Sequence, residues 1–248
     1  MAWQEAYATL WGASIGWHHR GLLLASVWLG YAADRWLDGW RSGRQKSRRH
    51  DFYHEHRWGL LGIWSGVLPG AIAVAAIHLQ AAELWRGGWL VVGVLAYTGF
   101  AQTQSRKPHY KTIKAVGIAV LIQASACLFP TPWALIRVAH LAALIGPIPL
   151  FALNCLMIEN WEKHELSRED PPSSHVRLIA LSVAAMGLAL LNLLPTAQTA
   201  TELIALPSIV SLILLWTLHS NRSRIAMAPC RTLADFCLLT PFIALLTT

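Results

Sequence analysis

The sequence predicts an all-α protein, a polytopic bundle of transmembrane helices. Of its 248 residues, 55% are hydrophobic and 13% are charged, and the mean hydropathy is +0.42. Soluble domains usually carry about 25% charged residues. The apolar residues also come in blocks of membrane-spanning length, and short polar loops separate these blocks. We therefore expect one integral-membrane domain over residues 1–248, inserted by its own spans because no cleavable signal peptide is evident.

The hydrophobic blocks predict eight spans along the chain. Residues 2–16 can form a helix, but at about 1.5 Å per residue they cannot cross a hydrocarbon core of about 30 Å. This stretch is therefore expected to be an interfacial helix or the remains of a ninth span. We expect a kink at Pro69-Gly70 and an interruption at Gly146-Pro147-Ile148-Pro149. The spans are expected near residues 18–38, 58–79, 89–104, 112–129, 133–160, 176–194, 200–219 and 230–247.

Basic residues alternate between the connecting loops. The loops after the first, third, fifth and seventh spans are rich in Lys and Arg, whereas the intervening loops contain Arg86 alone. The positive-inside rule therefore places the basic loops in the cytoplasm. This topology accounts for the formal net charge of +7, so we do not expect nucleic-acid binding. It also places the acidic ends of the first and fifth spans on the cytoplasmic side.

Two carboxylates stand where the first span should meet water. Asp34 and Asp38 are one helical turn apart and share one helix face. Acids within a membrane segment are costly enough that a functional role is the first interpretation. An Mg²⁺-bridged diphosphate suits them, because Mg²⁺ binds carboxylate and phosphate oxygens and arginines bind the remaining phosphate charge. Alternatively, Asp34 pairs with Arg35 or Arg41 and only closes the helix end. The basic residues that follow are Arg41, Arg44, Lys46, Arg48 and Arg49.

A second acidic group lies at the end of the fifth span. Glu159 and Glu162 are three residues apart and share a face, and Asn154 precedes them by about one and a half turns. They are candidates for a second ion site. The alternative is a solvated helix end in which Glu162 pairs with Lys163 or Lys107.

In the eighth span, Arg231 and Asp235 are spaced one turn apart on one face. A structural salt bridge inside the bundle is one interpretation of this pair. In the other interpretation, Arg231 faces the interior and helps to bind an anion.

Histidines are concentrated around the first span. His50, His54 and His56 lie in the basic loop after it, and His18 and His19 precede it. A histidine-rich loop can bind a transition metal, but the order of these residues matches no established ligand spacing. We therefore interpret the loop as a polar segment that faces phosphate groups or lipid headgroups.

The stretch Asp34-Arg35-Trp36-Leu37-Asp38 resembles the first aspartate-rich motif of UbiA-type membrane prenyltransferases, N-D-x-x-D-x-x-x-D. Asp34 and Asp38 occupy its last two acidic positions. Gly30 and Tyr31 stand at its leading Asn and Asp positions, so half of the motif is missing. Further positions look similar to the family pattern: Arg44, Arg48 and Arg49 near its basic positions, Tyr97 and Lys107 in its Y-x-x-x-L-K-R segment, and Asn154, Glu159 and Glu162 at its second acidic motif.

The resemblance implies helices around a central cavity that opens to the cytoplasmic side. It also implies Mg²⁺-dependent transfer of a prenyl group from a prenyl diphosphate to an aromatic or lipid acceptor. Asp34, Asp38, Glu159 and Glu162 would then hold Mg²⁺ and act in catalysis. Substrate-binding roles would fall to Arg41, Arg44, Arg48, Arg49, Tyr97, Lys107, Asn154 and Arg231.

Two alternatives stay open. A terpene cyclase on the same scaffold would use the prenyl diphosphate without an acceptor. A non-catalytic isoprenoid- or lipid-binding membrane protein, or a transporter, would lack the reaction altogether, and the missing Asn-Asp pair favours this reading. In each case we expect membrane lipids as partners.

Overall fold

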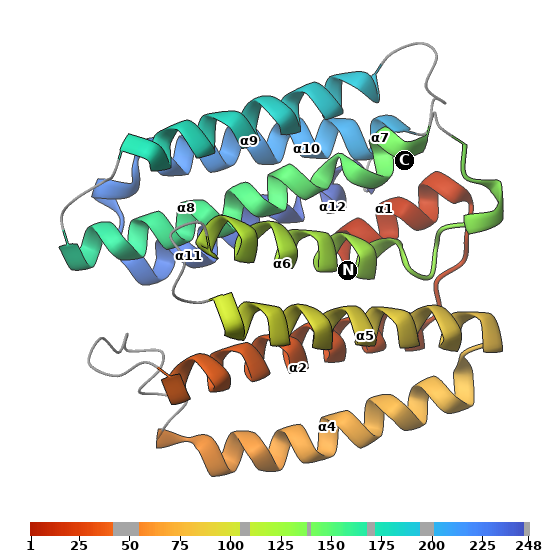
Figure 1. Ribbon diagram of the computed structural model, residues 1–248. Helices are drawn as coiled ribbons and strands as arrows, with labels where there is room; N and C mark the ends of the chain where they lie inside the picture. Colours follow the sequence, from red (N-terminus) through yellow and green to blue (C-terminus); the bar gives the residue numbers. More distant parts are fainter. Residues whose placement is uncertain (42–54, 105–109, 138–139, 168–171, 194–200, 246–248) are drawn as a thin grey trace. The chain divides into compact units, whose positions relative to one another are not determined.

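The computed structural model describes residues 1–41, 55–104, 110–137, 140–167, 172–193 and 201–245, and in these ranges every regular element is a helix (Figure 1). The all-α expectation is confirmed for this part of the chain. The elements are α1 (Ala2–Trp11), α2 (Trp17–Arg41), α4 (Arg57–His78), α5 (Ala81–Gln104), α6 (Tyr110–Cys127), η1 (Trp133–Leu135), α7 (Leu141–Ile145), α8 (Pro147–Ser167), α9 (Pro172–Leu191), α10 (Glu202–Ser220), η4 (Arg222–Arg224), α11 (Met227–Phe236), η5 (Cys237–Leu239) and α12 (Pro241–Leu245).

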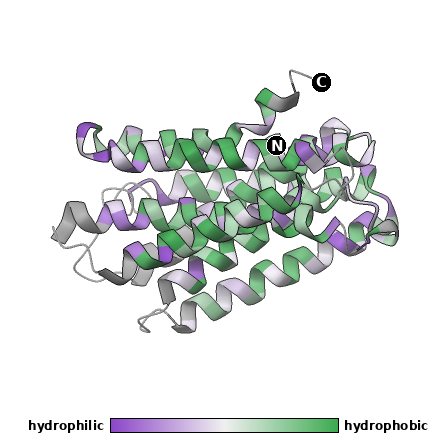
Figure 2. Cartoon of the chain, turned by 90° about the horizontal axis from the view of Figure 1, so that it is seen from above, coloured by the Kyte–Doolittle hydropathy of each residue, from purple (hydrophilic) through white to green (hydrophobic). Residues whose placement is uncertain are grey.

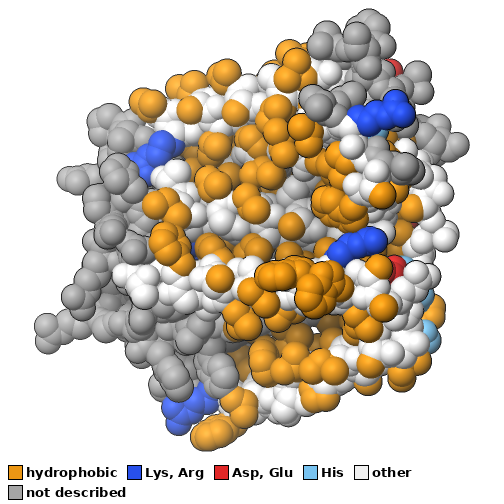
Figure 3. Space-filling model, turned by 45° about the vertical axis from the view of Figure 1, so that its right-hand side comes forward, with side chains coloured by type: hydrophobic (Ala, Val, Ile, Leu, Met, Phe, Trp, Pro, Cys, Tyr) orange, Lys and Arg blue, Asp and Glu red, His pale blue; other side chains and the backbone are white. Residues whose placement is uncertain are grey.

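Three stretches are long and apolar enough to cross a membrane: α4, the α7–α8 stretch Leu141–Glu162, and α10. Hydrophobic residues run along the helices, and hydrophilic residues gather toward several helix ends (Figure 2). On the face drawn in Figure 3, hydrophobic side chains are plentiful over the helices and the Lys and Arg side chains lie toward the margins. No described residue of α4 is buried, as expected for an apolar helix that faces lipid.

The chain forms two compact units. Unit 1 comprises residues 1 and 15–100, and unit 2 comprises residues 2–14 and 101–248. In unit 1, α2 packs along α4, and the Trp64 indole N–H donates to the carbonyl of Leu29 at 3.4 Å. Helix α5 begins earlier than the span expected at 89–104, because the Glu83 carboxylate accepts the Gln80 amide N–H at 2.8 Å and caps its first turn. The single-domain expectation stays a prediction.

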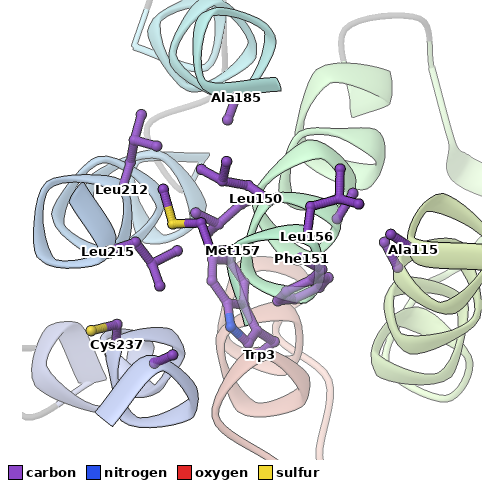
Figure 4. Packing of buried hydrophobic residues seen from close by; sticks show 14 of the residues in the cluster. Trp3, Ala115, Leu150, Phe151, Leu156, Met157, Ala185, Leu212, Leu215 and Cys237 are labelled. Carbon is purple, nitrogen blue, oxygen red and sulfur yellow. The ribbon is translucent and has the colours of Figure 1, made fainter. Parts of the chain in front are cut away.

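Helix α8 is the centre of unit 2. It packs against α6, α9, α10 and α11, and its fully buried Leu150, Leu153 and Met157 meet Leu215 of α10 in the core (Figure 4). Lipid tails are as apolar as leucine, so close packing rather than burial from water stabilises helix pairs in a membrane. Small residues on α6 permit this close packing against α8: Ala115, Ala119 and Ala126 are all buried.

Helix α1 packs into the core of unit 2, and the expectation that residues 2–16 form an interfacial helix or the remains of a ninth span stays a prediction. Its Trp3 ring packs edge-on against Phe151 with ring centroids 5.4 Å apart, and Tyr7 is fully buried. The helix ends at Gly12, whose φ of +60° closes it in a left-handed turn that favours glycine.

Proline breaks two of the expected spans. The stretch 133–160 divides into η1, α7 and α8, and the stretch 230–247 divides into α11, η5 and α12. The first division was expected at Gly146-Pro147, whereas the second was not expected, although Pro241 lies within that stretch. Each proline lacks an N–H, so a carbonyl in the preceding turn loses its helical donor.

Side chains from α1 supply the missing donors. The Tyr7 hydroxyl donates to the carbonyl of Ala143 at 2.7 Å, the carbonyl that Pro147 leaves without a helical partner. The Trp3 indole N–H donates to the carbonyl of Leu238 at 2.9 Å, three residues before Pro241. Two aromatic residues of α1 therefore donate hydrogen bonds to the carbonyls left without helical donors at both breaks. These contacts explain why this short helix is buried.

Candidate functional site

Four polar side chains meet on the seam between α8 and α11, in unit 2. The Asn154 amide donates from Nδ2 to Oδ1 of Asp235 at 3.2 Å. Two turns further along α8, Glu162 Oε1 lies 2.8 Å from Nη2 of Arg231. Because Asp235 follows Arg231 by one turn, the order of the two pairs shows that α8 and α11 run antiparallel at this seam.

The seam offers one buried acceptor. Asn154 is 5% exposed, and its Nδ2 must face Asp235 because a carboxylate only accepts hydrogen bonds. That fixes the direction of Oδ1, which is buried and has no hydrogen-bond donor among the described residues. A buried acceptor without a donor costs about 1–3 kcal/mol, so this oxygen is suited to a ligand that brings a donor or a positive charge.

The ion pair at the other end of the seam is partly open to solvent. The side chains of Arg231 and Glu162 are 21% and 28% exposed. Burial at this level strengthens the charge-assisted hydrogen bond while leaving one edge of each group accessible. The arginine also cancels the charge that Glu162 would otherwise offer to a cation.

Sequence reasoning missed a neighbouring aromatic group. The Trp161 indole N–H donates to Nδ1 of His219 at 2.9 Å, so the neutral imidazole carries its proton on Nε2. Trp216 stands edge-on to His219 with centroids 5.3 Å apart and donates to the hydroxyl of Ser182 at 2.8 Å. The available signal was a histidine in the last turn of an apolar span, followed directly by the arginines of η4.

The residues predicted on the first motif are described only in part. Asp34, Asp38 and Arg41 lie in the unbroken α2 helix, so its backbone keeps the one-turn spacing of the two acids, but their side chains lie outside the described residues. Arg44, Arg48, Arg49 and Lys107 lie entirely outside the described residues, and so do His50 and His54.

The remaining predicted residues divide between the units. Tyr97 lies half-buried on α5 in unit 1. Asn154, Glu162 and Arg231 come together on the α8–α11 seam, and Glu159 lies half-buried on α8. The structure pairs Arg231 with Glu162, a partner that was not foreseen, and the suggested pairing of Arg231 with Asp235 stays a prediction.

The magnesium site stays a prediction, because the side chains of Asp34 and Asp38 lie outside the described part of the chain. No three His, Cys, Asp or Glu side chains there are close enough together to hold a metal ion. The oxygen atoms of Asn154, Glu159 and Glu162 are nevertheless the type of donor that Mg²⁺ prefers. The donor chemistry fits the ion, with Glu162 reaching it only after it separates from Arg231.

Comparison with known proteins finds no relative of this chain. No protein-family profile, curated protein or solved structure matches the chain. The resemblance to UbiA-type enzymes therefore rests on its residues alone.

Proposed function

We propose that the chain is a membrane-embedded transferase that moves a prenyl group from a prenyl diphosphate to an aromatic or lipid acceptor, with Mg²⁺ required. The observation that carries this proposal is the α8–α11 seam, where Asn154, Glu162, Arg231 and Asp235 join polar groups within an otherwise apolar unit. In this proposal eight or nine spans surround a cavity that opens to the cytoplasm, and the seam lies at its cytoplasmic end. The apolar walls would take the isoprenoid tail.

In this proposal the acidic residues bind Mg²⁺: Asp34 and Asp38 on α2, and Glu159 and Glu162 on α8. Bound Mg²⁺ would supply charge neutralisation for the departing diphosphate. Arg231 and the basic residues Arg41, Arg44, Arg48, Arg49 and Lys107 would bind its oxygens.

The Arg231–Glu162 pair gives this site a resting state. Without substrate, each group neutralises the other across the seam. A diphosphate presents more negative charge to the guanidinium than one carboxylate does, so it would compete for Arg231. Glu162 would then be released at the same moment as a cation needs its oxygens. Asn154, held by Asp235, would keep its buried oxygen pointed at the same seam.

The test is prenyl transfer by the full-length chain in phosphatidylcholine nanodiscs. A panel of prenyl diphosphates of increasing chain length is incubated with a phenolic acceptor and Mg²⁺, and products are read by mass spectrometry. The double variant Asp34→Asn, Asp38→Asn should lose about a hundredfold or more of the transfer rate. Glu202→Gln, the same chemical change at an exposed position on α10, should leave the rate unchanged. Undiminished transfer in the double variant would refute the assignment.

One observation favours a second candidate, a non-catalytic isoprenoid- or lipid-binding protein. Glu162 already has Arg231 as its counter-ion, and a seam neutralised in this way can bind a headgroup without any metal. Isothermal titration with a non-hydrolysable prenyl diphosphate separates the two functions. Binding that strengthens with Mg²⁺ supports the transferase, and equal binding with and without Mg²⁺ supports the second candidate.

A further inference from the structure

Three imidazole rings meet in unit 1, where α2 begins and α4 ends. The ring of His18 lies 4.1 Å from that of His19 and 5.3 Å from that of His78, measured between centroids. The His18 and His78 rings are almost parallel, with an interplanar angle of 16°. Trp17 stands against the same group, 5.0 Å from His78. Contacts this short between imidazoles are favourable while the rings are neutral.

The hydrogen bonds of His19 fit its neutral form. The Gly16 amide N–H donates to Nδ1 at 3.2 Å, so Nδ1 carries no proton. Nε2 then carries the proton and donates to Glu83 Oε1 at 3.1 Å. The other Glu83 oxygen accepts the Gln80 amide N–H at 2.8 Å and caps α5. Protonating Nδ1 would take away the acceptor of Gly16.

If all three rings were protonated, their positive charge would exceed the single negative charge of the Glu83 carboxylate. The Glu83 carboxylate contacts His19 at 3.1 Å, whereas the ring contacts of His18 are with His19 and His78, which are also imidazoles. A ring that gains a proton beside a protonated neighbour is opposed by the like charge. Histidine changes charge between about pH 5 and 8, so mild acid reaches this range. The titratable and charged groups carried by the three helix ends are His18, His19 and Arg20 on α2, His78 on α4, and Glu83 and Arg86 on α5.

We propose that His18, His19 and His78 form an acid-sensitive latch, which joins the start of α2 to the α4–α5 turn when neutral and releases it when protonated. Helix α2 runs unbroken from this latch to Arg41. Release would therefore free one end of the helix whose other end carries Asp34 and Asp38. The latch lies within unit 1, and its test needs no transferase activity.

The first test follows the fluorescence of Trp17, since a protonated imidazole in contact quenches an indole. The full chain in phosphatidylcholine nanodiscs, with EDTA present, is titrated from pH 8 to pH 5. The signal of Trp17 is the difference between the unaltered chain and Trp17→Phe. We expect this difference to change within the titrated range, where histidine changes charge. Trp85→Phe is the matched control, since Trp85 packs on Trp89, and it should keep the full pH-dependent change.

Variants of the latch residues show whether the change in Trp17 emission comes from protonation of the histidines or from a loss of structure. His18→Gln and His78→Gln should each flatten the change of Trp17 emission. Glu83→Gln can keep the cap of α5, but it removes the negative charge that favours protonation, so the midpoint should move to lower pH. This shift is readable even if a histidine variant fails to fold.

Hydrogen exchange gives an independent readout at the amide of Gly16. After correction for the intrinsic rate, protection of this amide should fall by about tenfold or more between pH 7.5 and pH 5.5, because its acceptor is the Nδ1 atom of His19, which cannot accept once it carries a proton. Equal protection at the two pH values would overturn the proposal. So would a Trp17 signal that does not titrate, or one that titrates with the same midpoint in Glu83→Gln.

Discussion

Replacing Tyr7 with phenylalanine tests how unit 2 tolerates its broken helices. The ring stays in place and only the hydroxyl is lost. That hydroxyl donates to the Ala143 carbonyl at 2.7 Å, and it accepts from Gln123 Nε2 at 2.6 Å. Pro147 has no N–H with which to replace the lost donor. The variant therefore leaves a buried carbonyl without a partner in the middle of a helix break.

The cost can be estimated from these contacts. Ala143 is 0% exposed, so water does not reach its carbonyl in the native state. A buried acceptor left without a donor costs about 1–3 kcal/mol. Gln123 loses one contact but keeps the carbonyl of Leu144 at 2.6 Å, so its share is small. We expect Tyr7→Phe to lower the free energy of unfolding by about 2 kcal/mol.

The assay is reversible unfolding of the full chain in mixed micelles as the fraction of denaturing detergent rises. Tyr31→Phe is the control, because Tyr31 is 43% exposed and an exposed substitution should change the free energy by about 0.5 kcal/mol or less. A double-mutant cycle between Tyr7→Phe and Gln123→Leu should be non-additive, since the two side chains share a hydrogen bond. Equal stabilities of Tyr7→Phe and Tyr31→Phe would refute the reasoning.

Three further changes test other parts of unit 2 by the same unfolding measurement. Gly146→Ala would bring a Cβ to 2.6 Å from the backbone oxygen of Ala142, so it should cost about 1–3 kcal/mol; an unchanged stability would contradict that packing. Gly12→Ala meets no atom within 4 Å, so its φ of +60° alone should cost about 1 kcal/mol, and a neutral result would argue against the left-handed turn. Arg231→Gln should cost about 1 kcal/mol by removing the ion pair with Glu162, and the double variant with Glu162→Gln should be non-additive; additive costs would show that the ion pair does not contribute to stability.

The sequence was sufficient to predict an all-α chain with apolar helices of membrane-spanning length, and it also placed most of the described helices. Helix α4 begins and ends within a residue of the span expected at 58–79. The burial of α1 could not be foreseen. Ten residues are too few to span a bilayer, and what holds them is the pairing of Trp3 and Tyr7 with carbonyls more than a hundred positions away. Only the tertiary structure brings these groups together.

The pairing of the polar side chains at the candidate site also could not be predicted from the sequence. Spacing along one helix suggested partners for Arg231 and Glu162 on their own helices or in adjacent loops. The partner of each across the seam depends on the register of α11 against α8, which no helical period encodes. Asn154 and Asp235 were noted separately, and the register joins them as well. The residues were identified, whereas the pairs were not.

Carbonyl groups near the start of α8 have hydrogen-bond donors, whereas one side-chain oxygen in its middle has none among the described residues. At its start, the carbonyls of Ala143 and Leu144 each receive a side-chain donor, from Tyr7 and Gln123, so the proline break is satisfied from within the unit. Further along, the oxygen of Asn154 is buried with no donor in the described part of the chain. Other buried acceptors of unit 2, such as Gln123 Oε1 and Asn192 Oδ1, also have no donor among the described residues. What sets Asn154 apart is its place on the same seam as the Arg231–Glu162 ion pair, and this makes the seam the place to look for the function.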